Sequence, residues 1–149
     1  MLALNNRAVP AVNELERGSL IHLWQQSSHL VVADVGDAVA GFLLLLDGPG
    51  RDYDSVNYSW FCERYERFSY VDRIVVAGAN RGGGIGRTLY DWAIEQGSPD
   101  YPVLCAEVNI RPRNQASLDF HEALKFVEVG QQDSPDGQKT VVMLARSLS

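Results

Sequence analysis

The sequence predicts a single α/β domain in which helices lie on both faces of a mixed sheet. Strand and helix patterns alternate along the second half of the chain, which predicts at least one right-handed parallel crossover. The turn signal Pro135-Asp136-Gly137 separates the last two expected strands and predicts a final antiparallel hairpin. No linker, repeat or biased segment divides the 149 residues, so we expect one domain over residues 1–149.

Two helices and two strands are expected in the first third of the chain. Pro10 and Gly18 bound a short helix over residues 10–17, since proline suits an early helical position and glycine a helix end. Ser19 can cap a second helix, whose shared apolar face comprises Leu20, Leu23 and Trp24. Two strands joined by a tight turn follow, over residues 31–35 and 38–46. The second strand is apolar on both faces, which favours a central place in the sheet.

The rest of the chain alternates between loops, helices and strands. A polar loop precedes a short amphipathic helix, which carries Phe61, Tyr65 and Phe68 on one face. Asn114 can cap a later helix that runs to about Lys125. The expected ranges are 47–57 for the polar loop, 81–86 for a glycine-rich loop before a helix that ends at Gly97 and Pro99, and 70–76, 103–109, 126–131 and 140–145 for strands.

Composition excludes several classes of protein. A net charge of −6 and a pI near 4.9 argue against nucleic-acid binding, because neutralising phosphate needs clustered cations. The longest apolar run, residues 38–46, is far shorter than the roughly 20 residues that span a bilayer. Cys62 and Cys105 are too few for a disulfide framework or a zinc site, and no signal-peptide pattern is visible. We therefore expect a cytoplasmic protein that binds neither membrane nor metal.

A glycine-rich loop, residues 81–87, lies between an expected strand and an expected helix and is the clearest functional signal. Backbone N–H groups at such a junction favour anions, above all phosphate. The P-loop pattern fails because Arg87 replaces its lysine and Arg81 its first glycine. The dinucleotide fingerprint fails because it needs a glycine at Leu89. The alternative is a glycine-rich connector that binds nothing.

Two motifs in this order resemble those of the GNAT acyltransferases. Arg81, Gly84 and Gly86 match the Arg/Gln-x-x-Gly-x-Gly pattern of the family's pyrophosphate loop. Residues 114–126 are similar to the family's Asn-x-x-Ala/Ser-x-x-aromatic/Leu-Tyr-x-x-x-Gly-Phe signature, with His121 for tyrosine and Lys125 for glycine. The resemblance covers roughly residues 31–145. It implies a mostly antiparallel sheet with a splayed parallel strand pair that holds coenzyme A.

The resemblance also implies where acetyl-coenzyme A binds. Its pantetheine arm pairs with the free backbone of the strand before the loop, while the loop's N–H groups and two arginines hold the pyrophosphate. Asn114, Ser117 and His121 fall within an arc of about 60° on their helix, so they can face one ligand. The implied cofactor-binding residues are Ile74, Val75, Val76, Arg81, Gly82, Gly83, Gly84, Ile85, Gly86, Arg87, Asn114 and Ser117.

In this family an amine attacks the thioester directly. An alkyl amine of pKa about 10.4 is protonated at neutral pH, so a base that takes its proton is useful. The resemblance makes Glu107 the first candidate for this base, and Asp72, on the other splayed strand, is the second. His121 occupies the place of the family's tyrosine acid and can protonate the leaving thiolate; the alternative is that it only packs or bonds to the cofactor.

Aromatic side chains concentrate between residues 53 and 70, in the segment that borders the acceptor site in the family. We expect acceptor contacts from Tyr58, Trp60 and Arg73, with Arg73 suited to a carboxylate. The other aromatic residues, Phe61, Tyr65 and Phe68, are expected to dock the short helix or to form a homodimer surface.

The main hypothesis is an acetyl-coenzyme A-dependent N-acetyltransferase that acts on a small-molecule amine or an amino-acid-like acceptor. One alternative within the family is acetylation of a protein N-terminus or lysine. Another is a module that binds acyl-coenzyme A without turnover, which the non-standard His121 keeps open.

Overall fold

The computed structural model describes residues 1–9, 12–97 and 100–148. Within these residues a six-stranded sheet has the order β1-β2-β3-β4-β6-β5. The strands are β1 (His29–Val35), β2 (Ala38–Gly48), β3 (Phe68–Val76), β4 (Val103–Arg111), β5 (Val127–Asp133) and β6 (Thr140–Ser147). The helices are α1 (Leu2–Arg7), α2 (Arg17–Gln26), α3 (Val56–Cys62), α4 (Ile85–Trp92) and α5 (Gln115–Ala123), with a 3₁₀ turn η1 (Gly78–Asn80) and a π-helical turn η2 (Ala93–Gly97).

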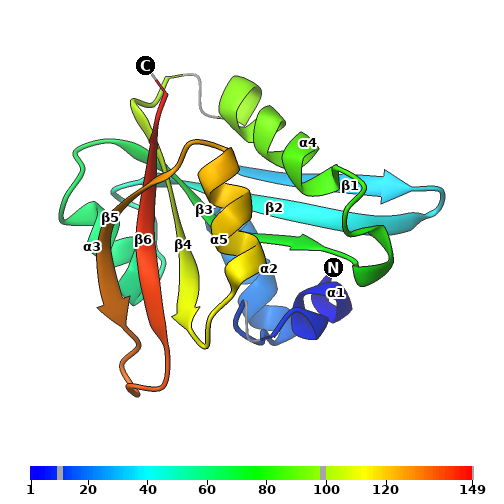
Figure 1. The fold of residues 1–149 in the computed structure, drawn as a ribbon, viewed down its shortest axis with the longest axis horizontal. Helices are drawn as coiled ribbons and strands as arrows, with labels where there is room; N and C mark the ends of the chain where they lie inside the picture. Colours follow the sequence, from blue (N-terminus) through cyan, green and yellow to red (C-terminus); the bar gives the residue numbers. More distant parts are fainter. Residues whose placement is uncertain (10–11, 98–99, 149) are drawn as a thin grey trace.

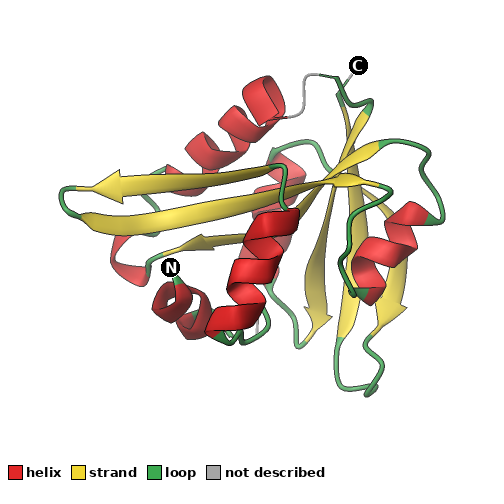
Figure 2. Ribbon diagram, turned by 180° about the vertical axis from the view of Figure 1, so that it is seen from behind, coloured by secondary structure: helices red, strands yellow, loops and turns green. Residues whose placement is uncertain are grey.

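Helices cover both faces of the sheet, which confirms the predicted fold class. The helices α4 and α5 lie on one face (Figure 1), and α1, α2 and α3 lie on the other (Figure 2). Each face has its own hydrophobic core, and β2 contributes to both because its successive side chains point in opposite directions. Phe42, Leu44 and Leu46 join the core beside α2 and α3, while Leu43 and Leu45 join the core beside α4.

The strands β3 and β4 form a parallel pair that separates almost at once. Their register contains Ser69↔Leu104 and Tyr70↔Cys105, and the described residues add no further pair. Beyond this point β3 continues beside β2 and β4 continues beside β6, so the two strands diverge (Figure 1). The other neighbouring strands are antiparallel, including the β5–β6 hairpin. The mixed sheet, the parallel pair and the final hairpin are therefore confirmed.

The N-terminal segment differs from the predicted helix over residues 10–17. Residues 12–16 are not helical, residues 10–11 lie outside the described part, and the first helix is α1. A side chain takes the place of helical bonds: Asn6 Oδ1 accepts the N–H of Leu15, and Asn6 Nδ2 donates to the Leu15 carbonyl, both at 3.0 Å. Asparagine competes with helix formation in this way because its amide mimics a peptide group.

The next helix also begins elsewhere than expected. Glu16, not Ser19, occupies the N-cap position of α2, and it makes no side-chain capping bond. Leu20 and Leu23 are buried as predicted, whereas Trp24 is 56% exposed. No helix in the described ranges is long and apolar enough to cross a membrane.

The helix that contains Phe61 is shorter than the spacing of Phe61, Tyr65 and Phe68 predicts. Ser55 caps α3 by accepting the N–H of Tyr58, so the helix starts inside the expected polar loop and ends at Cys62. Tyr65 lies in the loop after α3 and Phe68 begins β3. These two rings still pack with Phe61, at centroid distances of 6.1 to 6.4 Å. The helical spacing therefore reflects a cluster drawn from a helix, a loop and a strand.

Candidate active site

A cleft of about 1560 Å³ opens where β3 and β4 diverge. These strands, the glycine-rich loop and α5 line it, together with the N-terminal segment, residues 52–57 and the β5–β6 hairpin. A site for one small ligand usually measures about 300–1000 Å³, so this cleft is large enough to hold two ligands side by side.

The glycine-rich loop forms one end of the cleft. Gly82 and Gly84 have left-handed φ angles of 82° and 83°, which glycine adopts without the steric cost that a Cβ brings. Gly84 is the N-cap of α4, so the first N–H groups of this helix lack carbonyl partners inside it and favour an anion. Arg81 and Arg87 are exposed at the same place and line the cleft, adding positive charge.

A free edge of β3 continues from this loop along the cleft. Ile74, Val75 and Val76 pair with β2 on one side and, in the described part of the chain, with no strand on the β4 side. A strand edge of this kind binds extended chains that carry amides. An amide-bearing pantetheine arm therefore fits the strand edge, and an anionic pyrophosphate fits the adjoining loop.

The remaining predicted cofactor residues lie around the same end. Ile85, Gly86, Asn114 and Ser117 line the cleft, whereas Gly83 is not among its lining residues. A Cβ on Gly86 would lie 3.2 Å from the Phe120 ring, so glycine permits close packing of α4 on α5. The Asn114 side chain caps α5, as predicted, by accepting the N–H of Ser117 at 3.2 Å.

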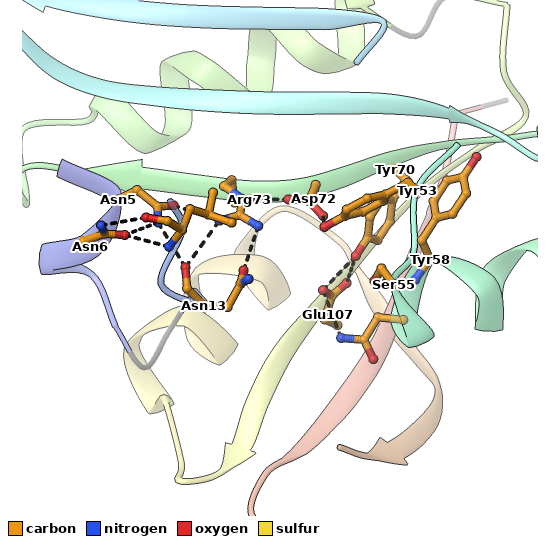
Figure 3. Close-up of polar contacts among 12 residues, drawn as sticks. Asn5, Asn6, Asn13, Tyr53, Ser55, Tyr58, Tyr70, Asp72, Arg73 and Glu107 are labelled. Carbon is orange, nitrogen blue, oxygen red and sulfur yellow. Dashed lines mark hydrogen bonds and ion pairs between the residues drawn. The ribbon is translucent and has the colours of Figure 1, made fainter. Parts of the chain in front are cut away.

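The carboxyl group of Glu107 lies at the cleft wall on β4 and is held from two other elements (Figure 3). The Tyr70 hydroxyl on β3 lies 2.8 Å from each Glu107 oxygen, and Asn57 Nδ2 on α3 donates to Oε1 at 3.3 Å. Gln132 on β5 holds Asn57 in turn, donating to its Oδ1 at 2.9 Å. These supporting residues are spread over the chain, and no motif predicted them.

Burial raises the pKa of Glu107 to about 8, and the nearby Asp72 carboxylate adds to this rise. The hydrogen bonds from Tyr70 and Asn57 and the charge of Arg73 act in the opposite direction. A carboxyl group with a pKa near working pH can take and return a proton, as general base catalysis requires.

The second predicted base, Asp72, is part of a buried polar network (Figure 3). Its carboxylate accepts the Tyr53 hydroxyl and the Nε–H of Arg73, the latter at 2.6 Å. The Arg73 guanidinium also donates to Asn5 Oδ1 and Asn13 Oδ1, both at 2.8 Å. The side chains of Asp72 and Arg73 are each 3% exposed. The network therefore ties the N-terminal segment to β3 beside Glu107.

His121 lines the cleft but is 3% exposed, and both of its ring nitrogens have partners. Nδ1 lies 2.7 Å from the Ser117 carbonyl oxygen, so Nδ1 carries the proton and Nε2 accepts the Tyr90 hydroxyl at 2.6 Å. Burial lowers the pKa of His121, which keeps the ring neutral at pH 7. This arrangement holds α5 against α4.

Two of the predicted acceptor contacts lie away from the cleft. Neither Tyr58 nor Trp60 is among the described residues that line it. The buried Tyr58 donates its hydroxyl to the Asp47 carbonyl at 2.9 Å, and Trp60 stacks on the Arg64 guanidinium at 3.7 Å. A Cβ on Gly130 would clash with the Trp60 ring, so this ring lies directly on β5.

Comparison with known proteins agrees with this geometry. The profile of the Acetyltransferase (GNAT) family matches residues 2–126. The fold is similar to that of smu.2055 from Streptococcus mutans (21% identity, 99% of this chain and 91% of that chain, TM-score 0.74). It is also similar to yncA from Salmonella typhimurium, solved with its cofactor acetyl-CoA (19%, 99% and 86%, 0.69).

A ribosomal-protein-alanine N-acetyltransferase from Brucella melitensis is similar as well (25% identity, 98% of this chain and 91% of that chain, TM-score 0.70). A search of curated proteins found no match. The profile match spans most of the chain, including both motifs beside the cleft. The chain therefore belongs to the acetyltransferase (GNAT) family.

Proposed function

We propose that the protein acetylates a primary amine by direct attack on acetyl-coenzyme A within a ternary complex. The observation that carries this proposal is the position of Glu107 on the wall of the cleft, beside the free edge of β3. A cleft of about 1560 Å³ supports simultaneous binding of the donor and an acceptor.

The donor end is proposed to be held by the chain's backbone and two arginines. The β3 edge at Ile74 to Val76 binds the amide-bearing arm, while the N–H groups at the start of α4, with Arg81 and Arg87, bind the pyrophosphate. Asn114 and Ser117 complete this end from α5. Acetyl-coenzyme A supplies a thioester whose carbonyl carbon is open to attack by an amine.

Glu107 is proposed to accept the amine's proton. Its carboxyl group faces the cleft, and Tyr70 and Asn57 fix its orientation. Asp72 is less suited to this role because Tyr53 and Arg73 already donate to its buried carboxylate.

The hydrogen bonds of His121 support a packing role for this residue. A neutral imidazole that donates to the Ser117 carbonyl and accepts from Tyr90 has no proton to give a leaving thiolate without breaking a bond. We therefore propose that His121 positions α5, and that it is not the acid of the reaction.

The acceptor is a small-molecule or amino-acid-like amine, or else the amino terminus of a protein. The similarity to a ribosomal-protein-alanine N-acetyltransferase favours the protein acceptor.

Thermal melting with ligands tests the donor site. Acetyl-coenzyme A or coenzyme A at 100 times its dissociation constant should stabilise the protein by about 2.7 kcal/mol, whereas ATP and NAD should have little effect. No stabilisation by either form of coenzyme A would refute the proposal.

Thiol release in the presence of amines then tests catalysis. Glu107→Gln should lower turnover by about 10²- to 10⁴-fold and leave coenzyme A binding intact. Glu122→Gln, an exposed change of the same kind on α5, is the matched control. Stabilisation by coenzyme A without thiol release from any amine would instead indicate a binding module.

A further inference from the structure

Two side-chain amides in series lead from Glu107 to the edge strand β5. Asn57 on α3 donates its Nδ2 group to Glu107 Oε1 at 3.3 Å, and Gln132 on β5 donates its Nε2 group to Asn57 Oδ1 at 2.9 Å. Asn57 lines the cleft, whereas Gln132 is half-buried and is not among the described residues that line it. Gln132 can therefore influence the site through Asn57 rather than by touching a ligand.

The sheet places Gln132 on the same face as Glu107. Gln132 pairs with Val141 on β6, which pairs in turn with Asn109 on β4, two residues from Glu107. Paired residues on neighbouring strands point to one face, and so do residues two apart on a strand. Val141 belongs to the same core cluster as Tyr58 on α3, so this is the face that α3 covers.

Gly130 allows α3 to lie close to β5. A Cβ at this position would clash with the Trp60 ring. Gly130 and Gln132 are two residues apart on β5 and share a face, while Asn57 and Trp60 are three residues apart on α3 and are neighbours on its surface. The packing of Trp60 on Gly130 therefore brings Asn57 within reach of Gln132.

The bond from Gln132 decides which end of the Asn57 amide faces Glu107. An asparagine amide has a donor on one side and an acceptor on the other. Because the Gln132 N–H group binds Oδ1, the Nδ2 group points to Glu107. With the amide turned by half a rotation, Oδ1 would face the carboxyl group and would favour its protonated form, which cannot act as a base.

On this geometry, and resting on the proposed acetyltransferase function, we propose that Gln132 is a positioning residue for the base. It holds the Asn57 amide with its N–H group toward Glu107, and so favours the carboxylate that accepts the proton of the amine. Neither sequence motif contains Gln132 or Asn57.

The charges around Glu107 are unchanged when Gln132 is replaced by an uncharged residue. The titratable and charged side chains that interact electrostatically with Glu107 are Tyr53, Tyr70, Asp72, Arg73, Tyr90 and Cys105. A change in the titration of Glu107 in such a variant therefore reports the Asn57 amide.

The test is a double-mutant cycle of Gln132→Met and Asn57→Ala in the free protein. The carboxyl carbon of Glu107 is titrated by ¹³C NMR, and its resonance is assigned by its loss in Glu107→Gln. Gln131→Met is the matched control, because Gln131 is the exposed neighbour on β5 and its amide donates to Glu128.

The wild-type pKa of Glu107, about 8, should rise by about one unit in Asn57→Ala, because a donor to the carboxylate is lost. Gln132→Met should raise it by about half a unit and lower kcat/KM about threefold below that pKa, with KM for acetyl-coenzyme A unchanged. In the Asn57→Ala background Gln132→Met should add nothing. An unchanged titration in Gln132→Met, or an equal shift in both backgrounds, would overturn the inference.

Gln132→Glu is a second, independent variant of the same length. A carboxylate at this position can only accept, so it should bind Nδ2 and turn Oδ1 toward Glu107. Its effect on the pKa of Glu107 should therefore be larger with Asn57 present than in the Asn57→Ala background, where the added charge acts alone. Equal effects in the two backgrounds would overturn the inference.

The two proposals fail in distinguishable ways. If coenzyme A does not bind, or if Glu107→Gln leaves thiol release unchanged, the proposed function or its base fails, and the NMR cycle still tests how Gln132 orients Asn57. If Glu107→Gln abolishes thiol release and the NMR cycle is additive, the base stands and the role of Gln132 falls.

Discussion

Replacing Glu107 by glutamine should stabilise the protein at alkaline pH even though it removes the proposed base. In the folded protein the pKa of this carboxyl group is raised from its ordinary value of 4.5 to about 8 by burial and by Asp72. Between these two values the unfolded chain releases a proton that the folded chain keeps, so stability falls as pH rises. Glutamine is neutral throughout this range, so the variant does not lose unfolding free energy in this way.

The size of the effect follows from the pH interval. Each pKa unit corresponds to about 1.36 kcal/mol, so the wild-type protein should lose up to about 2.7 kcal/mol of unfolding free energy between pH 6 and pH 8 through this group. Glu107 is half-buried at the cleft wall, so water reduces the figure to about 1–2 kcal/mol. Tyr70 and Asn57 can still donate to the glutamine oxygen, so the substitution leaves few groups unpaired.

Urea unfolding at pH 6 and pH 9 measures this difference directly. The stability advantage of Glu107→Gln over wild type should grow by about 1–2 kcal/mol between the two pH values, or by about 3–6 °C in melting temperature. Glu122→Gln, on the exposed face of α5, should show no such growth. A pH-independent advantage, or none at all, would refute the claim that the carboxyl group is held protonated in the folded protein.

Three other substitutions test parts of the structure separately. Tyr70→Phe removes a donor to Glu107 and should move the rise of kcat/KM with pH upward by about one unit, as a pH–rate profile would show. Lys125→Gly should stabilise the protein by about 0.5–1 kcal/mol in urea unfolding, because Lys125 has a φ of 69°; Lys125→Ala should give no such gain. Arg73→Met leaves the buried Asp72 carboxylate without its cation and should cost about 3–5 kcal/mol, part of which Asp72→Asn should restore.

Elements specified by nearby residues could be predicted from the sequence. The strand β2, the glycine-rich loop, the Asn114 cap and the final hairpin each depend on residues within a few positions of one another.

Lys125 shows how local chemistry links a motif to geometry. Lys125 follows α5 in a Schellman motif. In this motif the Lys125 N–H donates to the backbone carbonyl of Glu122, and the Phe126 N–H donates to the backbone carbonyl of His121. The glycine of the family pattern suits this left-handed position.

Elements that depend on contacts between distant residues could not be predicted. The irregular segment before α2 is held by Asn5 and Asn6, and Asn5 in turn binds Arg73, which lies 68 residues further along the chain. The expected contact of Arg73 with an acceptor carboxylate requires a free guanidinium, and nothing near Arg73 along the sequence indicates Asn5 as its partner. The partners of Glu107 present the same difficulty, since α3, β3 and β5 each supply one link.

The placement of Glu107 beside Asp72 conflicts with stability alone, since two nearby carboxyl groups in a buried wall disfavour ionisation. A conflict of this kind between local chemistry and stability is expected where a function is served. An ammonium group that enters the cleft would lower the pKa of Glu107, because a nearby cation stabilises the carboxylate. A neutral ligand would not have this effect. The carboxyl pair that weakens the empty protein at high pH would therefore favour the proposed base, the Glu107 carboxylate, when a cationic acceptor arrives.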